Sequence, residues 1–264
     1  CGSMANLKAL KAICDKHNLL LLEDACQAIG GTFEGKPLGS YGDLGCFSFD
    51  FVKTITSGEG GAVITNNEKY FTNADHYSDH GHDHVGNNRG AEGHPFLGYN
   101  YRISELHAAV GIAQLERLDS FLERQEQYYT IVREALSKIP EITFREVPEG
   151  GVENYSFLSF FMPTQELAEK AHKALGLEGV DACFYWFHNN WHYYRKWEHL
   201  TNQTSLGKLP KEVQKQLPDY TKSDFSLSDK WVGRNISCLI KLSWTIEEVD
   251  ERAKNMVKAL KSVL

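Results

Sequence analysis

The feature that most constrains the fold is a short apolar run that directly follows an amphipathic helix. Residues 4–18 place apolar side chains at helical spacing, and residues 19–22 are four consecutive leucines. This run ends in Glu23 and Asp24. Such a run after a helix is typical of a strand that is buried on both faces of a parallel sheet. We therefore predict an α/β protein, with functional side chains at the carboxyl end of this strand.

The rest of the pattern predicts further strands, helices and loops. Strands are expected where short runs are apolar or alternating, at residues 45–52, 62–65, 142–145, 156–162 and 238–243. Helices are expected at residues 104–139, 164–175 and 246–264. Residues 76–94 lack periodicity, and residues 202–224 are polar and contain proline, so both segments are expected to be loops. The long helix at 104–139 is expected to join a large domain, residues 1–120, to a smaller domain, residues 121–264.

Charge and hydropathy exclude several classes of partner. The net charge of -7 argues against nucleic acid and anionic membranes, because both bind basic surfaces. No stretch reaches the roughly 20 apolar residues that a membrane span needs, and no signal peptide opens the chain. A cytoplasmic location is therefore predicted.

The cysteines point to the same compartment. They are scattered and include no C-x-x-C pair, being Cys1, Cys14, Cys26, Cys46, Cys183 and Cys238. In a chain of 264 residues without a secretory signal, we expect reduced and mostly buried thiols, although an even number permits disulfides.

Three short segments carry the residues of one recognisable chemistry. They are residues 23–28 (Glu-Asp-Ala-Cys-Gln-Ala), 48–53 (Ser-Phe-Asp-Phe-Val-Lys) and 58–61 (Gly-Glu-Gly-Gly). Chemistry with pyridoxal 5'-phosphate (PLP) needs a lysine for a Schiff base, a carboxylate for the pyridine nitrogen and donors for the phosphate. An acid at a strand end, and a strand bearing serine and lysine before a glycine-rich turn, supply these groups.

These segments, with residues 39–43 (Gly-Ser-Tyr-Gly-Asp) and 98–105 (Gly-Tyr-Asn-Tyr-Arg-Ile-Ser-Glu), resemble the DegT/DnrJ/EryC1/StrS family of sugar aminotransferases. The resemblance covers essentially the whole chain. It implies the fold type I of PLP-dependent transferases (aspartate aminotransferase-like), here as an incomplete large domain and a small C-terminal α+β domain. It also implies that glutamate donates an amino group to a sugar carbonyl.

The family's site residues carry over one by one. Lys53 matches the Schiff-base lysine, which also shuttles the proton, and Asp24 matches the carboxylate that faces the pyridine nitrogen. Gln27 matches the contact to the phenolic oxygen, and Ser48 matches a phosphate ligand. Asn100 matches a residue that reaches the phosphate of the neighbouring subunit, which implies a homodimer with a shared site. The alternatives are a surface lysine, a helix-cap aspartate and plain structural hydrogen bonds for the other three.

Lysine at position 53 also separates the chain from a branch of the family that has histidine there and dehydrates sugars. The substrate is indicated by residues 79–84, 183–186, 189–193 and 239–244, which resemble a branch that installs an amine at C8 of a Kdo-type sugar for lipopolysaccharide. The expected acceptor is the C8 aldehyde of 3,8-dideoxy-8-oxo-manno-octulosonate, and the alternative is a nucleotide-sugar (keto-deoxyhexose) substrate.

Four residues are predicted to contact the sugar, namely His80, Asn190, Trp191 and His192. Sugar sites combine flat apolar faces with polar groups, but residues 186–197 fit a packed aromatic core equally well.

A histidine-rich loop offers a rival interpretation. His76, His80, His82 and His84 alternate with glycine and aspartate and include enough ligand atoms for a metal. Metal motifs place their ligands on a scaffold with further supporting partners. We therefore predict no metal and favour substrate contact or a plain loop.

The chain opens with Cys-Gly-Ser-Met, which is an unusual start. In the family, a Ser-Gly-Thr loop for the cofactor phosphate and a residue that stacks on the ring precede the point that matches Cys1. We expect that sequence before Cys1 is missing here. A hypothesis of a different class is an inactive fragment that survives as a dimerising α/β module.

Overall fold

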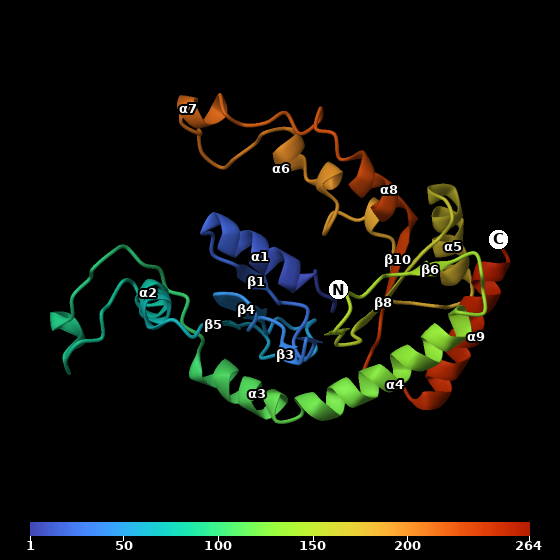
Figure 1. The fold of residues 1–264 in the computed structure, drawn as a ribbon, viewed down its shortest axis with the longest axis horizontal. Helices are drawn as coiled ribbons and strands as arrows, with labels where there is room; N and C mark the ends of the chain where they lie inside the picture. The colour runs from blue at the N-terminus through green and yellow to red at the C-terminus, as the bar shows by residue number, and fades with distance from the viewer. The chain divides into compact units, whose positions relative to one another are not determined.

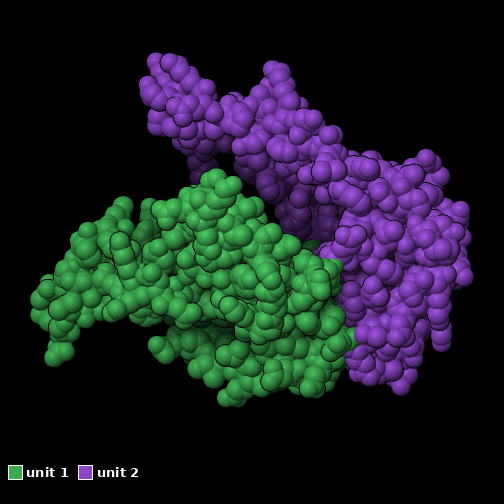
Figure 2. All heavy atoms as spheres, viewed as in Figure 1, with its two compact units in different colours: residues 1–126, 147–156 green, residues 127–146, 157–264 purple.

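The computed structural model describes residues 1–264, which form two compact units (Figure 1, Figure 2). Unit 1 comprises Cys1–Glu126 and Val147–Ser156, and unit 2 comprises Gln127–Glu146 and Phe157–Leu264. Helix α4 (Leu118–Leu136) begins in unit 1 and ends in unit 2. That residues 1–120 and 121–264 form separate domains stays a prediction.

Unit 1 is built around a three-stranded sheet in the order β1-β4-β5. Strand β1 (Leu22–Asp24) runs parallel to β4 (Leu44–Ser48), and β5 (Gly61–Ile64) is antiparallel to β4. The prediction of a strand buried on both faces was wrong, because Leu19, Leu20 and Leu22 are 57%, 58% and 56% exposed. More than half of each of these side chains is therefore exposed.

The other elements of unit 1 surround this sheet. They are α1 (Leu7–His17), β2 (Thr32–Phe33), β3 (Lys36–Pro37), α2 (Glu68–Ser78), the 3-10 turn η1 (Arg89–Ala91), α3 (Glu105–Leu115) and β7 (Gly151–Val152). Strands β3, β2 and β7 form a second small sheet. Phe33 of this sheet belongs to a compact apolar cluster with Leu7, Ala25, Ala28 and Leu38.

Two predictions for this region were wrong in detail. Helix α2 was missed, and it covers the first residues of the predicted loop at 76–94. It begins where the side chain of Asn67 accepts a hydrogen bond from the Tyr70 amide, which is a local capping interaction. The predicted helix at 104–139 is two helices, α3 and α4, because the chain tightens at Arg117, whose amide bonds to the carbonyl of Gln114 at 3.1 Å.

Unit 2 contains a four-stranded antiparallel sheet in the order β6-β8-β10-β9. Its strands are β6 (Thr143–Phe144), β8 (Phe157–Phe161), β9 (Cys183–Phe184) and β10 (Asn235–Leu239). Its helices and 3-10 turns are α5 (Gln165–Leu177), η2 (Trp186–His188), η3 (Tyr194–Lys196), α6 (Glu198–Thr201), α7 (Lys211–Gln214), α8 (Ser226–Arg234) and α9 (Ile246–Lys261). Strand β10 lies earlier than the predicted 238–243, because Asn235 already pairs with Phe161 of β8.

The apolar faces of α4, α5 and α9 pack with the sheet of unit 2 into one core. Leu158, Phe160, Ile236 and Val249 in this core have no exposed surface. The Tyr128 hydroxyl of α4 donates to the Trp244 carbonyl at 2.6 Å, which ties α4 to the start of α9. No helix in the structure combines the length and the apolar character that a membrane span requires.

The expectation of six reduced thiols was wrong for one pair. Cys183 and Cys238 form a disulfide, because β9 and β10 pair antiparallel and set these two residues opposite each other. The other four cysteines form no disulfide and are partly exposed rather than buried. The two bonded residues are 55 positions apart in sequence, so only the register of the strands reveals the bond.

The core of unit 2 leads to a stability prediction with an internal control. Leu158→Ala removes a side chain that is 0% exposed, whereas Leu177→Ala removes one that is 88% exposed. We expect Leu158→Ala to lower the free energy of unfolding by about 3–5 kcal/mol, because a cavity is added to the lost apolar transfer. We expect Leu177→Ala to change it by less than about 0.5 kcal/mol. Urea unfolding of both variants tests this, and equal losses would contradict the core described here.

Candidate active site

The carboxyl end of β1 and the loop that follows β4 lie together and carry Asp24 and Lys53. Asp24 lies opposite Cys46 in the parallel register of β1 and β4, and the next amide, Ala25, donates to the Cys46 carbonyl at 2.9 Å. Lys53 is partly buried in the turn after β4, where its amide donates to the Asp50 carbonyl at 3.0 Å. The sheet register thus brings together a carboxylate and a lysine that are 29 positions apart in sequence (53 minus 24).

The environment of Asp24 keeps its carboxylate charged. Its Oδ1 accepts the Cys26 amide at 3.1 Å. Hydrogen bonds from Cys26 are the main cause that lowers the pKa of Asp24, burial opposes them, and the positive charge of Lys53 adds to the lowering. Asp24 is therefore ionised at neutral pH.

The amine of Lys53 is uncommitted, since it makes no hydrogen bond or ion pair with another residue of the chain. A charged carboxylate and a free amine in one cluster match what PLP requires of its protein, namely an anion for the ring nitrogen and an amine for the aldehyde carbon. The residues present therefore fit this cofactor.

The loop that carries Lys53 is closed by its own backbone. The Phe49 amide donates to the Gly60 carbonyl at 2.8 Å, and the Ser57 amide donates to the Phe49 carbonyl at 2.9 Å. A Cβ atom at Gly60, whose φ is +150°, would lie 2.7 Å from the Ser57 hydroxyl oxygen, so only glycine fits. The predicted tight turn at residues 58–61 is confirmed, and it fixes the backbone on both sides of Lys53.

Ser48 and Gln27 flank this cluster. Ser48 is the last residue of β4, and its Oγ accepts the Asp50 amide at 3.3 Å, which leaves the hydroxyl hydrogen available for another acceptor. Gln27 uses its backbone carbonyl to accept the side-chain amide of Asn154 at 3.1 Å. Its own side-chain amide is partly buried and makes no hydrogen bond within the chain.

Cys26 is a member of the cluster to which the sequence assigned no role. Its Sγ lies 3.7 Å from the Cys46 carbonyl oxygen. Burial is the main cause that raises the pKa of the Cys26 thiol to about 11, and the hydrogen bond and charge of Asp24 add to it. The thiol is therefore protonated at neutral pH and does not compete with Lys53 as a nucleophile.

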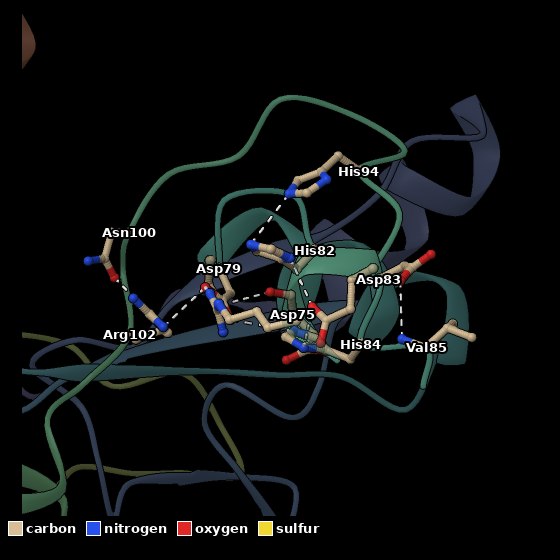
Figure 3. A network of polar contacts seen from close by, with 12 residues as sticks. Asp75, Asp79, His82, Asp83, His84, Val85, His94, Asn100 and Arg102 are labelled. Atoms are coloured by element: carbon tan, nitrogen blue, oxygen red, sulfur yellow. Dashed lines mark hydrogen bonds and ion pairs between the residues drawn. The ribbon is translucent and has the colours of Figure 1, made fainter. Parts of the chain in front are cut away.

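Asn100 belongs to a polar network around Asp79 (Figure 3). Asp79 is buried and accepts from Arg89 at 2.5 Å and pairs with Arg102 at 3.3 Å. The hydrogen bond from Arg89 is the main cause that lowers the pKa of Asp79. Arg102 in turn donates to the Asn100 Oδ1 at 3.1 Å, and the amide nitrogen of the exposed Asn100 lies on the side away from Arg102 (Figure 3).

The histidines of residues 76–94 lie close to acidic side chains and to each other. The His82 Nδ1 lies 2.9 Å from the Glu92 Oε2, and its Nε2 lies 3.4 Å from the Nε2 of His94. The His84 Nε2 lies 3.5 Å from the Asp75 Oδ2. No group of three or more His, Cys, Asp or Glu side chains is arranged to hold a metal ion.

His80, the predicted sugar contact of this loop, is exposed. Its backbone has a φ of +58°, and its amide donates to the Tyr99 carbonyl at 2.9 Å.

The aromatic segment of unit 2 divides into a buried and an exposed part. Trp186 is 7% exposed and stacks on Phe184 with 4.9 Å between ring centroids. Trp191 is 61% exposed, and the exposed His192 meets Trp186 edge-on at 4.7 Å. The Asn190 carbonyl accepts the Trp197 indole N–H at 2.7 Å, which leaves the exposed Asn190 side chain available. The packed-core interpretation therefore holds for Trp186, and the sugar contacts of Asn190, Trp191 and His192 stay a prediction.

Comparison with known proteins agrees with this geometry. The model of the DegT/DnrJ/EryC1/StrS aminotransferase family matches residues 1–251. The GDP-perosamine synthase of Vibrio cholerae is 32% identical over 205 residues, which are 78% of this chain and 54% of that protein. A UDP-4-amino-4,6-dideoxy-N-acetyl-beta-L-altrosamine transaminase of Campylobacter jejuni is 31% identical over 185 residues, 67% of this chain and 48% of that protein.

The fold has solved relatives as well. Helicobacter pylori PseC, an aminotransferase involved in the biosynthesis of pseudoaminic acid, superposes with a TM-score of 0.79 at 19% identity and covers 99% of this chain and 65% of that one. Structures with this fold include PLP and PMP forms. The chain spans about half the length of the curated relatives it matches. With the fold of PLP-dependent transferases of type I and a family match over nearly its whole length, this chain belongs to the DegT/DnrJ/EryC1/StrS aminotransferase family.

Proposed function

We propose that the protein containing this chain is a PLP-dependent aminotransferase that moves an amino group from glutamate to the carbonyl of a sugar. The observation that carries the proposal is the cluster of an uncommitted Lys53 amine and an ionised Asp24 carboxylate at the carboxyl end of β1. The named relatives are sugar-modifying enzymes of the same family, which supports a sugar acceptor.

Each residue of the cluster has a task in this proposal. PLP, when bound, supplies an electron sink for the bond-breaking at the amino carbon. Lys53 holds the cofactor and then moves a proton with its Nζ. Asp24 holds a proton on the ring nitrogen, the Cys26 amide keeps that carboxylate ionised, and Ser48 donates to the phosphate. Gln27 keeps its predicted contact to the phenolic oxygen as part of this proposal.

A homodimer with a shared site completes the proposal. Asn100 is exposed with its amide nitrogen on the side away from Arg102, and apolar side chains around it and on α3 are uncovered, with Leu97 79%, Tyr101 66% and Leu106 81% exposed. Contiguous exposed apolar surface is typical of subunit interfaces. We propose that a second copy covers this surface and receives Asn100 at its cofactor phosphate. A dimer mass in light scattering would support this, and a monomer mass would contradict it.

For the acceptor we propose the C8 aldehyde of 3,8-dideoxy-8-oxo-manno-octulosonate. One support is that residues 79–84 and 183–193 resemble the family branch that installs an amine at C8 of a Kdo-type sugar. The other is the exposed Trp191, which offers an aromatic face to a sugar ring beside His192 and Asn190. His80 is proposed as a further contact. A nucleotide-sugar acceptor is the second candidate, because the named relatives are GDP- and UDP-sugar enzymes.

A competition assay separates the two acceptors. The protein is supplied with PLP and glutamate, and then with equal concentrations of the octulosonate aldehyde and of GDP- and UDP-linked 4-keto-6-deoxy sugars. Mass spectrometry of the products reads which sugar gains an amine. An aminated octulosonate supports the first candidate, and an aminated nucleotide sugar replaces it with the second. No aminated sugar of either kind would contradict the proposed function.

The exposed tryptophan gives a prediction in the same assay. Trp191→Ala is expected to raise the KM for the sugar about tenfold with less than about a threefold change in kcat, because the ring contributes contact area and no proton transfer. The matched control is Leu206→Ala, since Leu206 is a fully exposed apolar residue of the same unit. An unchanged KM would remove Trp191 from the sugar site.

A further inference from the structure

Glu23 is a buried acid that the reaction itself does not use. It is the middle residue of β1 and the only buried side chain of that strand, at 8% exposure. A carboxylate that leaves water must be compensated by hydrogen bonds, because burying an unpaired charge is costly. Glu23 is compensated entirely by backbone amides.

Three amides of the loop at residues 39–42 donate to this one carboxylate. The Gly39 amide donates to Oε2 at 2.9 Å, and the amides of Tyr41 and Gly42 both donate to Oε1 at 2.7 Å. Hydrogen bonds to an ionised acceptor are stronger than neutral ones. The carboxylate therefore holds this loop against β1 at three points.

Asp43, directly after this loop, makes two further hydrogen bonds with Leu21, directly before β1. The Asp43 Oδ2 accepts the Leu21 amide at 2.8 Å, and the Asp43 amide donates to the Leu21 carbonyl at 2.8 Å. The approach is close enough that a Cβ atom at Gly42 would lie 2.5 Å from the Leu21 carbonyl oxygen. Loop and strand are therefore locked on both sides of Leu22.

These contacts affect the position of Asp24, which follows Glu23 in β1. Strand β1 has three residues and pairs only with β4, so its own ladder holds it weakly. Successive side chains of a strand point to opposite faces. Fixing the Glu23 side chain on one face therefore fixes the direction in which Asp24 leaves the other.

We propose that Glu23 is a positioning residue, which holds the end of β1 so that the Asp24 carboxylate is presented beside Lys53. This role rests on the proposed function, in which Asp24 serves the cofactor ring nitrogen. Glu23 touches neither cofactor nor substrate in this account and acts only through the loop at residues 39–42.

The test is Glu23→Gln in the PLP-binding protein. Glutamine has the same shape, but whichever carboxylate oxygen becomes the NH₂ group, at least one backbone amide loses its acceptor and faces a donor. Hydrogen exchange in the protein without cofactor is expected to accelerate at least about tenfold at the amides of 39–42, and the dissociation constant of PLP is expected to rise about tenfold. Glu68→Gln, the same change at an exposed acid at the start of α2 in unit 1, is the control for both readouts.

Two further variants keep the test decisive. Asp43→Ala removes the acceptor of the Leu21 amide and is expected to weaken PLP binding in the same direction, so it replaces Glu23→Gln if that variant does not fold. Val249→Ala lowers stability in the core of unit 2 and is expected to leave PLP binding unchanged.

Four outcomes are distinguishable. Faster exchange at 39–42 with weaker PLP binding supports the positioning role. Faster exchange or lower stability with wild-type PLP affinity would show a purely structural acid and overturn it, as would exchange identical to that of Glu68→Gln. Absence of PLP binding by the unmodified protein would instead contradict the proposed function, and with it this role.

Discussion

Replacing Lys53 by alanine is expected to lower the rate of amino transfer by about 10³-fold or more. The structure provides one uncommitted amine in the cluster at the end of β1, and in the proposed function its removal would eliminate both the covalent hold on the cofactor and the proton carrier. The backbone bonds that close the loop, such as Phe49 to Gly60, do not involve this side chain, so the fold is expected to persist. Single-turnover formation of 2-oxoglutarate from glutamate measures the loss.

Lys53→Arg is the matched variant for this prediction. It keeps a positive charge and a long side chain, but a guanidinium is never the neutral amine that attacks an aldehyde. We expect it to be as inactive as the alanine variant. Substantial activity in Lys53→Arg would show that the lysine acts only through its charge, and wild-type activity in Lys53→Ala would remove it from the reaction.

The second large effect is expected at Asp24. Asp24→Asn keeps the shape of the side chain and its acceptor for the Cys26 amide, yet it removes the charge that holds a proton on the ring nitrogen. We expect kcat to fall about 10²-fold with little change in thermal stability, because an exposed carboxylate contributes little to folding while a fixed charge at the reacting ring contributes much. Asp15→Asn, at an exposed acid of α1, is the control.

The charge of Asp24 also predicts how kcat of the unmodified enzyme depends on pH. The Cys26 hydrogen bonds lower the pKa of Asp24, so the carboxylate stays charged down to pH values below the ordinary range of aspartate. Its contribution to catalysis is therefore present at neutral pH and is lost only as the pH falls through that lowered pKa. A loss of kcat centred near pH 6 that disappears in Asp24→Asn would contradict this assignment.

Sequence patterns located the elements that carry the cluster. Apolar runs identified strands near β1, β4 and β5, and the motif order identified the fold type and the family, which the comparisons confirm. These features are local, because a strand end and a glycine-rich turn leave their mark in neighbouring residues. The lysine and aspartate could therefore be named before their spatial relation was known.

Features that depend on register or on distant contacts could not be predicted. The disulfide between Cys183 and Cys238 exists because β9 pairs with β10 at those two residues. Glu23 reads as one more surface acid in the sequence, and only the returning loop at 39–42 reveals it as a buried acceptor. The exposed Leu19, Leu20 and Leu22 show the same limit, because the burial of a strand depends on which other elements cover it.

The most direct test of the central claim is borohydride reduction of the protein after incubation with PLP, followed by peptide mass mapping. Borohydride makes the bond between a lysine and the cofactor permanent, so the label reports which amine holds it. We predict one phosphopyridoxyl group per chain, on the peptide that contains Lys53 and absent from Lys53→Arg. A label on a different lysine, or no label at all, would contradict the account of Lys53 as the cofactor-holding residue.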